Sequence, residues 1–142
     1  IAPATFERYS VPHLASFADI MHARGKAAIA HMCGHIRGLL PSIARTGIDG
    51  INYVTPPPLG DTPWSEVFEV LGDDFIVDAA ITPELWMAPA TLEEVTRNVA
   101  AVVTNDLLER NIMLTAGADG LPGIPIERFT VVTEALRPFV LS

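Results

Sequence analysis

Four stretches of this sequence are mostly apolar, and a segment with helical spacing follows each of them. The stretches are "KAAIAHM" (residues 26–32), "GINYVT" (50–55), "DDFIVDAA" (73–80) and "NIMLTAG" (111–117). Strands with so little alternation between apolar and polar residues are typical of sheets covered on both faces. The repeated strand–helix order predicts right-handed βαβ units, so we expect an α/β fold with four consecutive βα units in a parallel sheet.

Proline, glycine and capping residues delimit the expected helices. We predict helices over residues 12–24, 35–47, from 62 onward, 91–110 and from 125 onward. In the first, the expected buried face consists of Leu14, Phe17, Ile20 and Met21. Pro41 is expected to kink the second helix. The next two begin at Thr62 and Thr91, each followed by a glutamate, Glu66 or Glu94, in a position suited to a capping box.

Composition narrows the class of protein and of partner. The 142 residues suit a single domain, and 49% hydrophobic against 18% charged residues indicates a globular chain. A formal charge of -8 argues against nucleic acid or an anionic membrane as partner, because both attract clustered Lys and Arg. Its one cysteine cannot form an internal disulfide. We therefore expect a reducing compartment, the cytoplasm, and no membrane span.

The number of strands raises the question of what completes the sheet. Four βα units do not close an eight-stranded barrel. The chain also starts at Ile1 rather than at a methionine, which favours a piece of a longer protein. We expect either half of a barrel or a chain that self-associates, because exposed strand edges invite pairing with another copy.

The candidate metal ligands are His31 and Cys33, two residues apart near the end of the first predicted strand. Residues at that spacing point to the same side of a strand, and imidazole with thiolate is a donor pair that zinc prefers. The alternative is a buried thiol beside a hydrogen-bonded histidine in the core. His35 is expected in the first turn of the next helix, facing solvent.

Three aspartates follow or interrupt strands and are candidates for a pocket. Asp78 lies within "FIVDAA", where a carboxylate must be paired, protonated or functional. Its alternative role is a hydrogen bond to loop amides. Asp61 precedes a helix and is suited either to capping or to substrate binding. Asp119 in "TAGADG" follows the fourth strand, where turn geometry alone also explains the neighbouring glycines.

Aromatic residues at the same ends of the strands are candidates for contact with substrate. Asn52 and Tyr53 close the second strand, and strict alternation would place them on opposite faces. Trp64 and Trp86 fall in the loops after the second and third strands. Either tryptophan is suited to forming the wall of a pocket or to ordinary packing.

Several segments, taken in order, resemble the C-terminal half of the uroporphyrinogen decarboxylase superfamily. They include "IAHMCGHIRGLLPSIARTGIDGINYV", "PPPLGDTPWSEVFEVLGDDFIVDAAITPEL" and "TAGADGLPGIPIERF", and the likeness covers nearly the whole chain, residues 1–142. The resemblance implies a (β/α)8 barrel, of which these would be the last four units. The superfamily includes cofactor-free porphyrinogen decarboxylases and cobamide-linked methyltransferases that bind zinc.

The resemblance implies a role for each candidate residue. In the methyltransferase branch, an HxC motif after strand five and a later cysteine bind zinc, and here the HxC is His31 and Cys33. Ala118 stands where that cysteine, or the late histidine of the decarboxylases, is expected; the replacement ligand would be Asp119, the nearest candidate, or a residue of the first half of the barrel. "AAITP" also replaces the usual "GNLDP" of the decarboxylases.

Three hypotheses about function follow. The first is metal-assisted methyl transfer between a small methylated substrate and a thiol, or a corrinoid on a partner protein. Asp78 or Asp119 would then orient the substrate, and Tyr53, Asp61 and Trp86 would line its pocket. The second is cofactor-free decarboxylation of a porphyrinogen, although Arg37 is the only basic residue expected near these strand ends. The third is an inactive half-barrel that self-associates.

Overall fold

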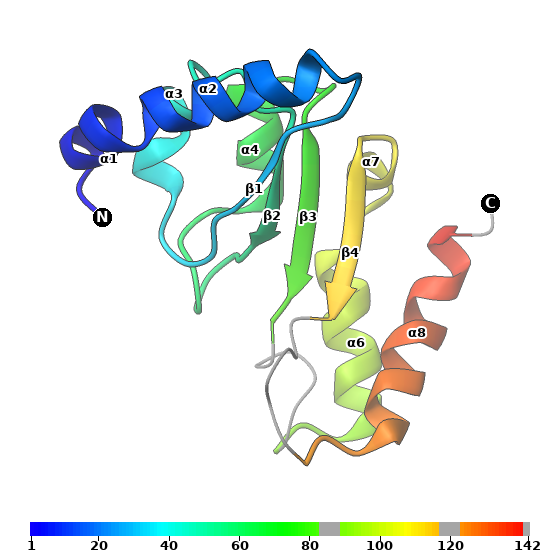
Figure 1. The fold of residues 1–142 in the computed structure, drawn as a ribbon. Coiled ribbons are helices and arrows are strands. Elements are labelled where there is room, and N and C mark those ends of the chain that lie inside the picture. The colour runs from blue at the N-terminus through cyan, green and yellow to red at the C-terminus, as the bar shows by residue number, and fades with distance from the viewer. Residues whose placement is uncertain (83–88, 117–122, 141–142) are drawn as a thin grey trace.

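Four parallel strands form the centre of the protein. The structure, a computed structural model, describes residues 1–82, 89–116 and 123–140. The strands are β1 (Ile29–His31), β2 (Gly50–Val54), β3 (Ile76–Ile81) and β4 (Ile112–Ala116). Each strand pairs in parallel with the next, in the order β1-β2-β3-β4 (Figure 1). The predicted α/β fold is confirmed, and strands that follow one another in sequence order are arranged as in part of a (β/α)8 barrel.

Helices precede, connect and follow the strands. They are α1 (Pro3–Tyr9), α2 (Val11–His22), the 3-10 helix η1 (Arg37–Leu39), α3 (Leu40–Ile43), α4 (Trp64–Leu71), α6 (Leu92–Val102), α7 (Asn105–Leu108) and α8 (Ile126–Val140). Helices α6 and α8 pack against each other beside β4 (Figure 1). Within the described ranges, no helix combines the length and apolar character needed to cross a bilayer.

The core lies between one face of the sheet and these helices. Alternate sheet residues are fully or almost fully buried there, namely Ile51, Val77, Ala79 and Ile81. They share a single cluster with helix residues, including Val67 and Phe68 of α4 and Val95 and Val99 of α6. We call this helix-covered side the outer face and the opposite side the inner face. The strands are rich in apolar residues because the side chains on their outer face are buried against the helices.

The first predicted helix differs in its buried face. Leu14 and Met21 pack partly buried against the core as expected, but Phe17 and Ile20 are 39% and 51% exposed. The residue of this helix that is almost fully buried is Ala18. Ala18 lies against Gly47, where an added Cβ would come within 3.8 Å of the Ala18 Cβ. The small residue permits this close approach, which a pattern of large apolar residues does not indicate. A short helix that the sequence analysis did not predict, α1, precedes α2 and buries Phe6.

The second predicted helix is two short helices rather than one kinked helix. Its apolar stripe, Ile36, Leu39, Leu40 and Ile43, is buried as expected. Pro41 does not kink a continuous helix. It lies in the first turn of α3, where the absence of an N–H group leaves no hydrogen bond broken. His35 precedes η1 rather than lying in a helical turn, and it is exposed.

Only one of the two predicted capping boxes forms. The Thr91 hydroxyl accepts the Glu94 N–H at 3.2 Å, and the Glu94 carboxylate accepts the Thr91 N–H at 2.7 Å. Helix α4 instead begins after Pro63 without a side-chain cap. The helix predicted to run to residue 110 ends at Val102, and α7 follows as a separate turn.

Candidate functional site

A row of polar side chains crosses the inner face, with one contributed by each strand. The Nδ1 atom of His31 on β1 lies 2.6 Å from the Oδ1 atom of Asn52 on β2. The Asn52 amide nitrogen donates to Oδ2 of Asp78 on β3. The Thr115 hydroxyl on β4 donates to the other Asp78 oxygen at 2.5 Å. We call these four residues the inner-face polar row.

The row lies on the side of the sheet that the helices do not cover. Asp78 and Ala80 alternate with the core residues Val77 and Ala79 along β3. Two large apolar residues on the inner face, Ile29 and Met113, are 38% and 51% exposed. In a (β/α)8 barrel the helices surround the strands, so the inner face corresponds to the barrel interior.

A β-bulge in β2 brings Asn52 and Tyr53 to the same neighbour. The register advances by three residues on β2, from Ile51 to Val54, while it advances by two on β3. The extra residue breaks the alternation that predicted opposite faces for Asn52 and Tyr53. Asn52 contacts His31 by hydrogen bond, and the Tyr53 ring centroid lies 5.5 Å from that of the histidine.

Tyr53 adopts a backbone conformation that is rare for a tyrosine. Its φ is 70°, in the left-handed region, where it is the only non-glycine residue within the described ranges. Such a conformation costs about 1–3 kcal/mol and persists where the surroundings enforce it, most often at functional sites. The strain therefore coincides with the point at which β2 reaches the polar row.

The predicted metal ligands His31 and Cys33 lie at the carboxyl end of β1. His31 is the last residue of the strand and Cys33 follows two residues later. Both side chains are exposed, contrary to the alternative of a buried thiol in the core. Among residues 1–82, 89–116 and 123–140, no group of three or more His, Cys, Asp or Glu side chains is suited to holding a metal. Ala118 and Asp119, where a further ligand was expected, lie outside the described residues.

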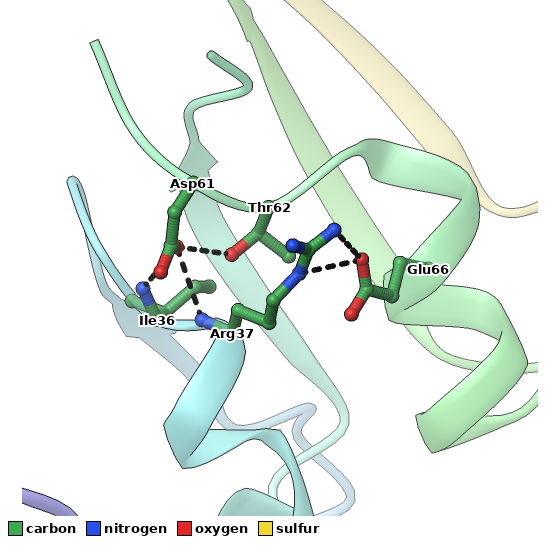
Figure 2. A network of polar contacts seen from close by, with 5 residues as sticks. All are labelled: Ile36, Arg37, Asp61, Thr62 and Glu66. Atoms are coloured by element: carbon green, nitrogen blue, oxygen red, sulfur yellow. Dashed lines mark hydrogen bonds and ion pairs between the residues drawn. The ribbon is translucent and has the colours of Figure 1, made fainter. Parts of the chain in front are cut away.

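Asp78 and Asp61 are both held by hydrogen bonds, but by partners that the sequence did not indicate. Asp78 is only 5% exposed and is bonded to side chains of the neighbouring strands rather than to loop amides. Asp61 caps a helix, although not the one that follows it. Its Oδ1 atom accepts the N–H groups of Ile36 and Arg37, at the start of η1 (Figure 2).

The contacts of Asp61 join the loop after β1 to the loop after β2. The Thr62 hydroxyl also donates to Oδ1 of Asp61, at 2.7 Å, and Arg37 forms an ion pair with Glu66 on α4 (Figure 2). Burial alone would raise the pKa of the Asp61 carboxyl. The Thr62 hydroxyl, the two backbone N–H groups and nearby His35 outweigh it and hold the pKa below its ordinary value. The carboxylate is thus stabilised by its role as a link between loops.

The loops after β1 and β2 also meet at Thr55, where Gly60 is required. The Gly34 N–H donates to the Thr55 hydroxyl at 2.9 Å. A Cβ at Gly60 would lie 1.9 Å from the Thr55 carbonyl oxygen, closer than any real contact. Only glycine fits there, so the chain after β2 folds tightly back over the end of its own strand.

Of the two tryptophans predicted near the strand ends, only Trp64 lies within the described residues. Trp64 is buried in the first turn of α4, and its indole N–H donates to the Val54 carbonyl oxygen at 3.1 Å. It packs in the core, and it also lines a shallow pocket together with Pro63 and Leu107, away from the polar row. Trp86 lies outside the described residues, so its predicted place in a substrate pocket stays a prediction.

Two members of the polar row were not chosen from the sequence as site residues. Asn52 was considered only for its direction, and Thr115 is one threonine in an apolar strand. The sequence does contain a feature that indicates both residues, because each is a polar residue near the carboxyl end of a mostly apolar strand. Their link to Asp78 depends on strand register, which the sequence alone does not give.

Comparison with known families agrees with this architecture. The family described as Uroporphyrinogen decarboxylase (URO-D) matches residues 1–139. A comparison with curated proteins gave no match. The family has a TIM-barrel fold, and it includes both decarboxylases and methyltransferases. A parallel sheet in sequence order is what such a barrel requires, and the chain belongs to the uroporphyrinogen decarboxylase family.

Proposed function

We propose that this chain is part of an enzyme for metal-assisted methyl transfer from a small methylated substrate to a thiol or a corrinoid. His31 and Cys33 would hold a zinc ion. The observation that carries the proposal is the position of these two side chains, which lie exposed together at the carboxyl end of β1. That end of the strands is where barrel enzymes place their catalytic groups.

The donor set fits zinc in its chemistry. Imidazole and thiolate are both ligands that zinc prefers, and one ring nitrogen of His31 already has a partner in Asn52. A metal-binding histidine characteristically uses its other ring nitrogen for such a hydrogen bond. A structural or catalytic zinc needs at least one more protein ligand, for which Asp119 is the predicted candidate.

When bound, zinc would lower the pKa of a thiol and so favour the nucleophilic thiolate. The residues of the chain would orient the reactants. Tyr53, beside His31, is suited to packing against an apolar methyl-bearing group. Asp119 remains the proposed catalytic position, Asp78 is proposed to orient the site through its hydrogen-bond partners, and Asp61 and Trp86 remain the proposed binding positions.

Decarboxylation of a porphyrinogen is the alternative that the family also includes. A substrate with many carboxylates calls for arginine side chains in the site. Arg37, the arginine expected near the strand ends, is paired with Glu66 through both Nε and Nη2. This pairing favours methyl transfer over decarboxylation.

Cobalt(II) binding tests the proposed ligands. Co²⁺ replaces zinc in such sites, and a thiolate ligand gives it a charge-transfer absorption that water and carboxylate ligands do not. We expect the absorption to appear on titration and to be lost in both Cys33→Ser and His31→Gln. The matched control is His35→Gln, which removes an exposed histidine of the next loop and should leave the spectrum unchanged. A spectrum without thiolate absorption would contradict the proposal.

The partners and location are also proposals. A corrinoid protein would receive or supply the methyl group, and the lone cysteine favours the cytoplasm. Self-association through the inner face would cover Ile29 and Met113. Light scattering tests this, because a monomer at all concentrations would contradict it.

A further inference from the structure

We infer that Asn52 and Asp78 are positioning residues that keep a proton on Nδ1 of His31. Whenever the ring is neutral, the lone pair of Nε2 is then the group that His31 presents to a ligand. The use of this lone pair for zinc rests on the proposed function, whereas the position of the proton follows from the hydrogen bonds alone.

The first step concerns Asp78. Both of its oxygens accept hydrogen bonds, one from the Asn52 amide and one from the Thr115 hydroxyl. The residue is 5% exposed, so these side-chain donors replace most of its contact with water. A carboxylate can only accept, and the group facing it must be a donor.

The second step concerns the orientation of the Asn52 amide. Its NH2 group must face Asp78, since the carbonyl oxygen there would oppose a carboxylate oxygen. The carbonyl oxygen of Asn52 then faces His31, 2.6 Å from Nδ1. An oxygen acceptor at that distance requires a proton on Nδ1.

The third step concerns the ring itself. The Tyr53 ring lies beside the imidazole, with centroids 5.5 Å apart and planes inclined by 34°. Tyr53 is placed there by the bulge in β2, whereas Asn52 keeps the regular register with His31. One strand therefore supplies both the hydrogen bond to His31 and the packing against it.

Nitrogen-15 NMR of the imidazole rings measures this directly in the 142-residue chain, because the two ring nitrogens have different shifts in each tautomer. At a pH where the ring is neutral, we expect His31 to show the Nδ1–H form. Asp78→Asn removes the fixed acceptor, allows the Asn52 amide to turn over, and should produce a mixture of both tautomers. Asn52→Leu removes the hydrogen bond entirely and should have the same effect.

His22 is the internal control in the same spectrum. It bonds Asp49 through Nε2 at 2.8 Å, at the opposite end of the strands, and its signals should not change in either variant. A purely structural effect of Asp78→Asn would alter the amide spectrum without converting the His31 tautomer. Finding His31 with its proton on Nε2 in the unmodified chain would overturn the inference, even if neither variant folds.

Zinc titration separates this inference from the proposed function. Loss of the group that hydrogen-bonds a metal-binding histidine typically lowers metal affinity about 10–100-fold, so Asn52→Leu should bind zinc that much more weakly. A chain that shows the Nδ1–H form but binds no zinc would uphold the inference and contradict the proposed function. A chain that binds zinc but carries the His31 proton on Nε2 when metal-free would contradict the inference and uphold the proposed function.

Discussion

The two faces of the sheet are built from the same strands but by different interactions. The outer face carries apolar side chains such as Ile51 and Val77, which are 0% exposed against α4 and α6. The inner face carries the polar row from His31 to Thr115, beside exposed Ile29 and Met113. The comparison shows that burial of apolar surface stabilises the fold from one side. On the inner face, hydrogen bonds between polar side chains connect the strands.

Matched isoleucines on adjacent strands should show the largest contrast. Ile51→Ala creates a cavity in the core, and we expect a loss of about 2–5 kcal/mol in the free energy of unfolding. Ile29→Ala removes the same atoms from a side chain that is 38% exposed, and the change should stay within about 0.5 kcal/mol. Urea denaturation measures both. Equal losses would show that the inner face is packed like the outer one.

The polar row should give a smaller effect that is not additive. Asn52→Ala leaves buried Asp78 without one of its two donors, at a cost of about 1–3 kcal/mol. Once Asp78→Ala has removed the carboxylate, the same Asn52 substitution should cost less. A double-mutant cycle measures this coupling. Strict additivity would show that the two side chains act independently.

The hydrogen bonds of Asp61 should contribute less to the free energy of unfolding than the polar row does, and their contribution should depend on pH. Asp61→Ala removes the cap of η1, and loss of a cap typically costs about 1 kcal/mol. The folded pKa of Asp61 is lowered, so its contribution is present above about pH 3.9, the ordinary value for aspartate, and is lost as the pH falls through the folded value.

Acid titration of stability checks the sign. The unmodified chain should lose stability on acidification more steeply than Asp61→Ala does. Asp19→Ala, an exposed aspartate on α2, is the matched control and should follow the unmodified chain. An identical acid profile in all three proteins would contradict the role of Asp61 as a link.

The ion pair of Arg37 with Glu66 should have the smallest effect. The Arg37 side chain is 53% exposed, and surface pairs of this kind contribute little. We expect Glu66→Gln to be less destabilising than Asp61→Ala, with a difference that shrinks as salt is added. If Glu66→Gln lost more stability than Asp61→Ala, the ion pair rather than the aspartate would be the main contact between the two loops.

Much of the outer face could be predicted from the sequence, because burial follows local pattern. All four strands were expected, and so was the buried stripe from Ile36 to Ile43. The exceptions are close approaches that depend on small residues. Ala18 is buried against Gly47, while large apolar side chains of the same helix stay exposed.

The inner face could be predicted only in part, because its contacts join residues far apart in the chain. His31, Asp78 and Tyr53 were each identified from their strand positions. The bulge that brings Tyr53 beside His31, next to Asn52, has no local signal in "GINYVT". The cap that Asp61 provides reaches 25 residues back to Ile36, whereas sequence reasoning considered only the helix that follows it.

Metal content tests most directly whether the inner face and its rim hold a metal site. Zinc in the purified protein would be measured by plasma mass spectrometry beside Cys33→Ser, with urea denaturation of both proteins as a check on folding. We expect about one zinc per chain, lost in the variant while the fold is retained. No zinc in either protein, or the same zinc content in both, would contradict this expectation.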